Sequence, residues 1–216
     1  MNDIKQIAIN KLSQQNPKPL QFTLQDGTQV LLRPILPVDR ERIQNGMAAL
    51  SSRSRYFRFF TSGSRLSDQQ LRNFSEVDQH NHVAWVALDS SGPKHPGLGV
   101  ARFIRTNEKP TVAEMAFVVV DACQHRGLGT ILMAVLYLMA EARGVQVLRA
   151  TVLGENTRVC NWLCNLGATE TFECGECRLD LAVHHDHGLF PRTPSGENFK
   201  RAIEAMQTTF HGSEYH

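Results

Sequence analysis

The chain has 216 residues, of which 42% are hydrophobic and 20% charged, and this length fits one large domain or one domain with short additions. The composition excludes a disordered or collagen-like chain, because neither class has this share of apolar residues. There are 23 lysine and arginine residues against 21 acidic ones, so the net charge is +2. A charge this small gives no electrostatic argument for binding nucleic acid or an anionic membrane, and we expect neither partner.

The N-terminal segment has no basic stretch followed by an apolar one, as a secretory signal would. No uncharged apolar run approaches the ~20 residues that a membrane span needs. We therefore expect a cytoplasmic protein, in which the five cysteines stay reduced.

Four cysteines are close together in the sequence, namely Cys160, Cys164, Cys174 and Cys177. The last two have the C-x-x-C spacing of many zinc sites, and the run His184-His185-Asp186-His187 could also bind a metal. The first pair, however, has the spacing C-x-x-x-C inside a predicted helix. We therefore expect ordinary thiols, a solvated histidine cluster and no metal.

The first third of the chain predicts two helices around a hairpin. Residues 3–14 have apolar side chains at helical spacing and predict a short amphipathic helix. Strands over 22–24 and 30–33 flank Gln25-Asp26-Gly27-Thr28, whose Asp-Gly pair is typical of a hairpin turn. A helix follows from about 38 to 50.

Residues 51–65 hold four arginines and four aromatic side chains with no acidic residue among them. A nucleic-acid site would use such arginines on phosphates and such aromatics for stacking. The small net charge favours the other interpretation, which is an amphipathic helix whose aromatic side chains enter the core.

The rest of the chain predicts a sheet with three helices. Strands are expected over 83–88, 98–105 and 112–120, then a helix from Leu128 that ends at Gly144. A strand over 147–152, a helix over 156–165 and strands over 168–172 and 178–183 follow. After Pro191 and Pro194, a tail helix carries Phe199, Ile203, Met206 and Phe210. We expect this helix to dock on the core; a dimer contact or a lid is the alternative. The fold class is α/β (α+β).

The clearest chemical motif is the run Gln124-His125-Arg126-Gly127-Leu128-Gly129-Thr130, between a strand and a helix. Glycines let a ligand approach the backbone, and unpaired N–H groups at a helix start attract phosphate. A P-loop lacks its lysine here, and a dinucleotide fingerprint lacks its third glycine. A pyrophosphate arm such as that of coenzyme A, or a plain glycine turn, remains.

This motif resembles the acetyl-CoA loop of the GNAT N-acetyltransferase superfamily, and the resemblance covers about residues 28–183. Residues 1–27 would then hold an N-terminal helix and the start of the hairpin, and residues 184–216 a tail with an amphipathic helix. The resemblance narrows to the bacterial protein-lysine acetyltransferase branch, whose best-known target is acetyl-CoA synthetase. The segments that carry it are Ser54-Arg55-Tyr56-Phe57-Arg58-Phe59-Phe60, Val77-Asp78, His82, Gly99-Val100-Ala101-Arg102-Phe103 and Ala113-Glu114-Met115-Ala116-Phe117.

The resemblance implies a GNAT fold, which is a central mixed, mostly antiparallel sheet flanked by helices. It also implies acetyl-CoA as co-substrate. We expect an acceptor that is a protein lysine or a small amine, and a monomer or homodimer. Three functions stay open: acetylation of a protein lysine, acetylation of a small-molecule amine, and a non-catalytic acetyl-CoA-binding module.

A lysine amine, with a pKa of about 10.4, must lose a proton before it attacks a thioester. Glu114 is the only charged residue between Thr111 and Val120. Strand alternation places it among small apolar neighbours, where desolvation would raise its pKa. We predict that Glu114 is the general base, directly or through a water molecule.

The remaining site residues follow from the family resemblance. It implies that backbone N–H groups of Val118, Val119 and Val120 hold the thioester and pantetheine, with help from Asn156. Leu163 stands where many members have a tyrosine that protonates the leaving thiolate. His82 is our candidate for a catalytic group on the acceptor side.

Overall fold

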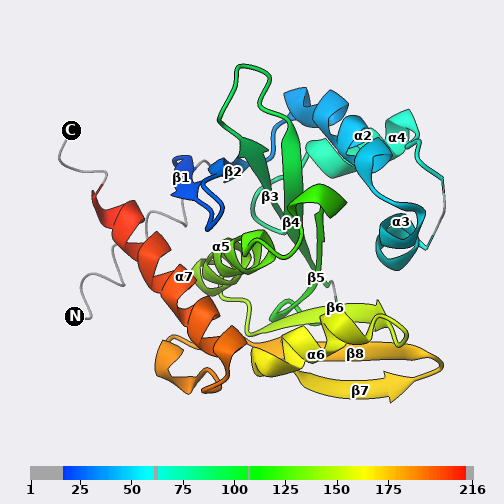
Figure 1. Ribbon diagram of the computed structural model, residues 1–216. Coiled ribbons are helices and arrows are strands. Elements are labelled where there is room, and N and C mark those ends of the chain that lie inside the picture. The colour runs from blue at the N-terminus through cyan, green and yellow to red at the C-terminus, as the bar shows by residue number, and fades with distance from the viewer. Residues whose placement is uncertain (1–16, 61–62, 107, 213–216) are drawn as a thin grey trace.

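The structure is a computed structural model that describes residues 17–60, 63–106 and 108–212. The helix expected over residues 3–14 and the side chain of Phe210 lie outside this description. Figure 1 shows a central sheet with helices on both faces.

The sheet has eight strands in the order β1-β2-β3-β4-β5-β6-β8-β7. Neighbouring strands are antiparallel except for β5 and β6, which are parallel. This confirms the expected mixed, mostly antiparallel α/β fold. The strands are β1 Leu20–Thr23, β2 Gln29–Pro34, β3 His82–Asp89, β4 Gly97–Arg105, β5 Val112–Val119, β6 Val147–Leu153, β7 Thr169–Glu173 and β8 Glu176–Ala182.

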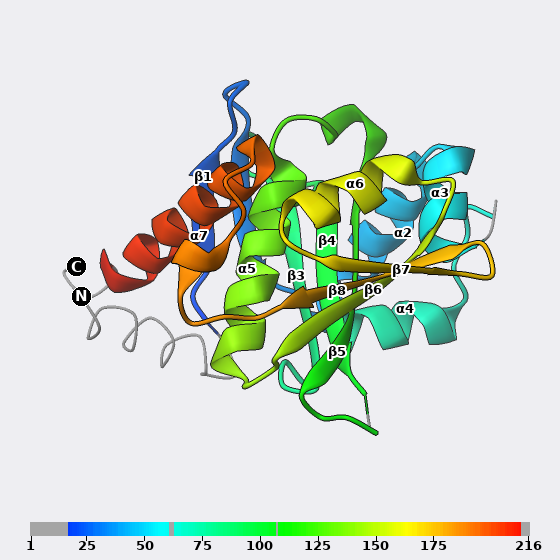
Figure 2. The ribbon, with the colours of Figure 1, turned by 90° about the horizontal axis from the view of Figure 1, so that it is seen from below.

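Two groups of helices cover the sheet, as the second view shows (Figure 2). One face carries α2 (Arg40–Ala49), α3 (Ser52–Phe59) and α4 (Asp68–Ser75). The other carries α5 (Leu128–Ala142), α6 (Thr157–Asn165) and α7 (Pro194–Gly212). Strand β3 is buried along nearly its whole length, because helices lie over both of its faces. Among the described residues, no helix is both long enough and apolar enough to cross a membrane.

The main core lies between the sheet and α5, which is buried on almost every side. Gly144 ends the α5 segment with a φ of +69°, a conformation that glycine adopts without a Cβ penalty. The tail helix α7 covers the outer side of α5. Its Phe199, Ile203 and Met206 are fully buried in the main core, which confirms that the tail docks on the core.

The structure corrects the prediction for segment 51–65. Its helix, α3, is shorter than expected and contains no fully buried residue. Tyr56 and Phe60 are 44% and 54% exposed, and only Phe59 packs against the small cluster of Met47, Leu50 and Leu66. The helix α4, for which we made no prediction, begins with a capping box in which Ser67 and Gln70 bond each other's backbone N–H groups.

The histidines at the start of the tail also differ from expectation. His187 is 3% exposed rather than solvated, and its Nε2 lies 3.3 Å from Oε2 of Glu141 on α5. His185 Nδ1 lies 2.8 Å from the other carboxylate oxygen. Burial would raise the pKa of Glu141, but the hydrogen bonds to the two histidines outweigh it and hold that pKa below its ordinary value. The cluster therefore anchors the tail to α5.

Candidate active site

The site begins where β5 and β6 separate. These parallel strands pair only from Val112↔Val147 to Glu114↔Arg149, although β5 continues to Val119 and β6 to Leu153. A groove of about 750 Å³ lies at this separation. It is lined by the diverging strands, by α3, by the loop after β5, by the first turn of α5 and by α6. The strand residues of the lining are Met115, Ala116, Phe117, Val118, Val119, Ala150, Thr151 and Val152.

The hydrogen bonds at both ends of β5 show which of its N–H groups face the groove. Val120 N–H donates to Leu98 O at 2.9 Å, and Val112 O accepts from Thr106 N–H at 3.1 Å. Bonding directions alternate along an antiparallel pair, so every second residue between these two points toward β4. The N–H of Val118 therefore faces β4, whereas those of Phe117 and Val119 face the groove. Our expectation is corrected for Val118 and Val120, whose N–H groups are directed away from the groove.

The N-terminus of α5 closes one end of the groove. Gly127, Gly129 and Thr130 line it together with Gln124 and His125. Gly127 has a φ of +86°, and no side chain caps the helix. Within the described part of the chain, the N–H groups of residues 128–130 have no hydrogen-bond acceptor. They leave the partial positive end of the helix free for a phosphate.

The side chains of two residues in the predicted motif do not face the groove. The side chain of Leu128 is fully buried in the core, so only its backbone N–H can serve a ligand. The guanidinium of Arg126 does not line the groove, because its Nη1 donates to Asp26 Oδ2 at 2.6 Å. Asp26 lies in the turn between β1 and β2, so this pair ties the hairpin to the start of α5.

The loop after β5 is fixed by contacts that sequence reasoning did not find. Asp121 accepts hydrogen bonds from Ser51 N–H, Ser51 Oγ and Ser54 Oγ at 2.8–2.9 Å. Gln124 Nε2 donates to Val119 O at 3.1 Å. The loop that presents the glycines is thereby attached to the N-terminus of α3. The pair of serines three residues apart at a helix start was the only sequence signal for this contact.

The opposite wall of the groove comes from α6. Asn156 precedes this helix, makes no capping bond and lines the groove. Its contact with pantetheine stays a prediction. Trp162 packs edge-on against Phe117 with ring centroids 5.2 Å apart. Leu163 is fully buried in the core, and none of the groove-lining residues that the structure describes is a tyrosine.

Glu114 is the last residue of β5 that pairs with β6. It stands beside Arg149, which in turn pairs with Asp180 on β8. Arg149 Nε and Nη2 each donate to one Asp180 oxygen at 2.7 Å. Glu114 therefore has charged neighbours that the sequence did not predict, its side chain is exposed, and it is not among the residues that line the groove.

The pKa of Glu114 is nevertheless raised, first by partial burial. Arg149 and Arg178 lower it and Asp180 raises it further. Among the described residues Glu114 forms no ion pair. Its carboxylate is thus available to a proton donor.

His82 is held as a partner of Arg102. Its Nε2 lies 3.2 Å from Arg102 Nη1, and because arginine only donates, Nε2 must accept. Burial and the Arg102 charge lower the pKa of His82 to about 4, against a smaller opposing effect of Asp78. His82 lines neither the groove nor the cavity described next. This geometry corrects our expectation, since the nitrogen that would take a proton is already used.

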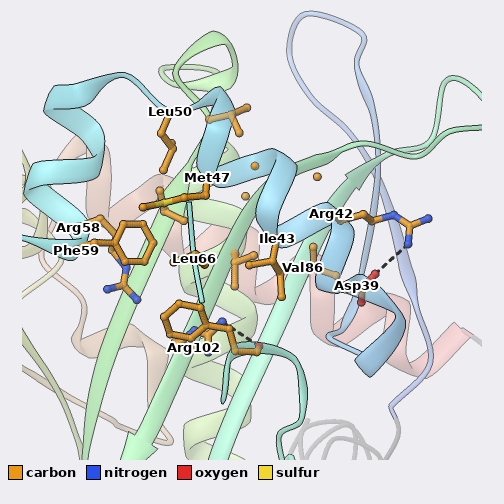
Figure 3. A pocket seen from close by; sticks show the side chains of 17 residues that line it. Asp39, Arg42, Ile43, Met47, Leu50, Arg58, Phe59, Leu66, Val86 and Arg102 are labelled. Carbon is orange, nitrogen blue, oxygen red and sulfur yellow. Dashed lines mark hydrogen bonds and ion pairs between the residues drawn. The ribbon is translucent and has the colours of Figure 1, made fainter. Parts of the chain in front are cut away.

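A second, smaller cavity of about 60 Å³ lies between the sheet and the helices α2, α3 and α4 (Figure 3). Arg58 and Arg102 point into it, and Arg58 also lines the groove. Arg102 stacks on Phe74 at 4.6 Å and donates to Phe74 O. Burial lowers the pKa of Arg58 to about 10 and that of Arg102, with help from Arg58, to about 9. Asp39, the acidic residue of the lining, is bonded to Arg33 and Arg42 instead.

The acetyltransferase (GNAT) family model matches residues 48–167, which span the groove and its glycine loop. The chain belongs to the GNAT acetyltransferase family. Acetyltransferase Pat of Mycolicibacterium smegmatis is 37% identical over 150 residues, which are 69% of this chain and 44% of that protein. An acetyltransferase of Pseudomonas aeruginosa is 29% identical over 67% of this chain and 77% of its own length.

The fold comparison agrees with the sequence comparison. The crystal structure of the GNAT domain of S. lividans PAT superposes with a TM-score of 0.69 and 28% identity, covering 76% of this chain and 96% of that one. The chain spans less than half the length of the mycobacterial relative. The prediction of a GNAT acetyltransferase is thereby confirmed. The assignment of individual site residues rests on the geometry alone.

Gly129 offers a test of the anion site in this GNAT groove. A Cβ added there meets nothing within 4 Å, and its φ is not positive, so Gly129→Ala should leave the fold intact or stabilise it by about 0.5–1 kcal/mol. The added methyl would occupy the space of a bound phosphate, and we expect calorimetry to show acetyl-CoA affinity at least ~10-fold weaker.

The matched control is Gly46→Ala in α2, where an added Cβ also meets nothing within 4 Å. It should leave acetyl-CoA affinity unchanged. Equal affinity in wild type and Gly129→Ala would contradict the assignment of the α5 N-terminus.

Proposed function

We propose that the chain transfers the acetyl group of acetyl-CoA to the ε-amine of a lysine in a protein, with Glu114 as general base. The observation that carries this proposal is the place of Glu114. It is the last residue before the stretch Met115–Val119 that lines the groove, so its backbone lies where the two strands begin to separate, next to the groove lining.

The chemistry requires a base and a site for the developing oxyanion. The amine nitrogen forms a bond to the acetyl carbon and gives its proton to Glu114, directly or through a water molecule. The carbon–sulfur bond then breaks and the thiolate leaves. The groove-facing N–H groups of Phe117 and Val119 are suited to stabilise the oxyanion. Burial raises the pKa of Glu114 and makes it a stronger base than an ordinary carboxylate.

No tyrosine is among the described residues that line the groove. Leu163 occupies the position where many GNAT enzymes have that residue, and its side chain points into the core. We infer that the thiolate takes its proton from water. A coenzyme A thiol is a good leaving group at neutral pH, so this step does not need a protein acid.

The surface next to the groove supports a protein acceptor. Phe60 lines the groove and is 54% exposed, and the neighbouring Tyr56 is 44% exposed on the same short helix end. Exposed aromatic side chains at the mouth of a site are typical of protein contact surfaces. The resemblance of the segment around Ser54–Phe60 to protein-lysine acetyltransferases points the same way.

One observation favours a second candidate, a small amine with an acidic group. Arg58 and Arg102 face a cavity beside Val118, and no acidic side chain among the described residues pairs with either. Buried cations without a counterion are costly, and a cavity of about 60 Å³ has room for a carboxylate. A small acidic acceptor would supply the missing charge.

Labelled acetyl-CoA separates these functions. Incubated with the protein and a cell lysate, it should label protein bands that yield acetyl-lysine on digestion. A labelled soluble metabolite with unlabelled proteins would identify the small-amine enzyme. Coenzyme binding without any transfer would identify a binding module and refute both enzymatic proposals.

Replacing Glu114 with glutamine removes the proposed base and keeps a side chain of nearly the same shape. Glu114→Gln should lower kcat by about 10²–10⁴-fold, the usual worth of a general base, and leave the Kd for acetyl-CoA unchanged. Glu173→Gln on the exposed strand β7 is the control and should keep wild-type turnover. Equal turnover of Glu114→Gln and wild type would exclude Glu114 as base.

The neighbours of Glu114 predict opposite pH shifts. Arg149 lowers the pKa of Glu114, so Arg149→Gln should raise that pKa and move the acid limb of kcat/KM to higher pH, because the base must be deprotonated. Asp180 raises the same pKa, so Asp180→Asn should move the limb to lower pH. Shifts of about 0.5–1 unit are expected for one nearby charge at a protein surface. An acid limb that stays in place in both variants would show that another group titrates.

A further inference from the structure

Three of the four clustered cysteines meet around one carboxylate. Cys160 on α6, Cys177 on β8 and Glu170 on β7 have ligand atoms that all lie within 4.8 Å of one another. Cys160 and Cys177 are 4% and 3% exposed, whereas Glu170 is exposed. The group is thus buried beneath α6 and open at one edge of the β7–β8 hairpin.

Cys164 is the nearest further donor, although its sulfur is not among the ligand atoms that all lie within 4.8 Å of one another. It follows Cys160 by one helical turn, and such residues share a helix face. Its Sγ lies 3.6 Å from Glu170 Oε2. Cys174, by contrast, is exposed in the turn between β7 and β8 with a φ of +52°. The C-x-x-C spacing in the sequence therefore does not describe the cluster.

This donor set fits Zn²⁺ better than other common ions. Zinc takes four ligands tetrahedrally, with sulfur at about 2.3 Å and carboxylate oxygen at about 2.0–2.2 Å, which places ligand atoms about 3.5–3.8 Å apart. The distances between the three ligand atoms are at most 4.8 Å. They need to shorten by only about an ångström to fit a zinc ion. Thiolates select zinc over the oxygen-preferring calcium and magnesium.

A disulfide between Cys160 and Cys177 is the competing use of these thiols. Burial, together with the hydrogen bond to Glu170, raises the pKa of Cys177 to about 12. Burial also raises the pKa of Cys164. Both uses require the thiolate, so these raised pKa values oppose a disulfide and a metal alike. The geometry favours a metal, because the Glu170 carboxylate lies within 4.8 Å of both sulfurs and would have no part in a disulfide.

We propose that Cys160, Cys164, Cys177 and Glu170 bind one Zn²⁺ ion. With four protein ligands the site is closed and structural rather than catalytic. It joins α6 to the β7–β8 hairpin, two elements that meet at the end of the sheet in Figure 1. Because Thr157, Arg158 and Trp162 of α6 line the coenzyme groove, the ion would also hold one wall of that groove in place. The proposal does not depend on the acetylation chemistry.

Cobalt titration tests the site without any activity assay. The untagged full chain, reduced and freed of metal by a chelator, is titrated with Co²⁺. One equivalent should give thiolate-to-cobalt charge transfer and the intense visible bands of tetrahedral Co²⁺. Zinc should abolish both, because it binds such sites more tightly than cobalt. Zinc should also raise the melting temperature by several degrees.

Cysteine-to-serine variants test which residues bind the ion. Cys177→Ser and Cys160→Ser should lose the charge-transfer absorption, and Cys164→Ser, at a half-buried position that tolerates change, should lose part of it with at least ~10-fold weaker zinc affinity. Cys174→Ser is the matched control and should keep both wild-type absorption and affinity.

Three results would overturn the proposal. The first is the lack of charge transfer in the reduced wild type. The second is unchanged absorption in both Cys164→Ser and Cys177→Ser. The third is a Cys160–Cys177 disulfide in peptide maps of the protein purified without oxidant.

Discussion

The parallel ladder between β5 and β6 ends after Glu114 and Arg149, and the arrangement of the site depends on this separation. Beyond it, the N–H groups of Phe117 and Val119 point toward a strand that is no longer there. Backbone groups without partners are rarely left buried, and they are satisfied by water or by a ligand. The same separation opens the groove, and the backbone of Glu114 lies where it begins. The uncapped start of α5 lies at the groove, so one backbone feature sets the places that we propose for the acetyl donor, the base and the phosphate.

The two faces of the sheet are packed differently. On one face, α5 and α7 form a tightly packed core with Tyr137, Phe190 and Phe199 in mutual edge contacts, which fixes the strands that carry the groove. On the other face, α2, α3 and α4 enclose a smaller cavity with Arg58 and Arg102. The uncapped start of α5 and the cavity with two buried arginines thus lie on opposite faces of the same central strands. The proposed zinc ion would extend the rigid part to α6, at the far wall of the groove.

Much of this could be predicted from the sequence because it depends on local patterns. Hydrophobic spacing predicted α5 and the central strands, and the Gly127-x-Gly129 loop indicated the uncapped start of α5 as the proposed anion site. Which N–H groups face the groove could not be predicted, because it depends on the register between β4 and β5. The charged neighbours of Glu114 come from 35 and 66 residues further along the chain. The meeting of Cys160 with Cys177, like the contact of Asp121 with Ser51, arises only when α6 and α3 pack against the sheet.

The most direct measurement is a crystal structure of the protein with coenzyme A. The account predicts pantetheine between β5 and β6, bonded to the N–H groups of Phe117 and Val119. It also predicts the pyrophosphate at the N–H groups of residues 127–130 and the sulfur on the Glu114 side of the groove. The account would be contradicted by a coenzyme bound away from the β5–β6 separation. A pyrophosphate held by Arg58 and Arg102 in place of the α5 N-terminus would contradict it equally.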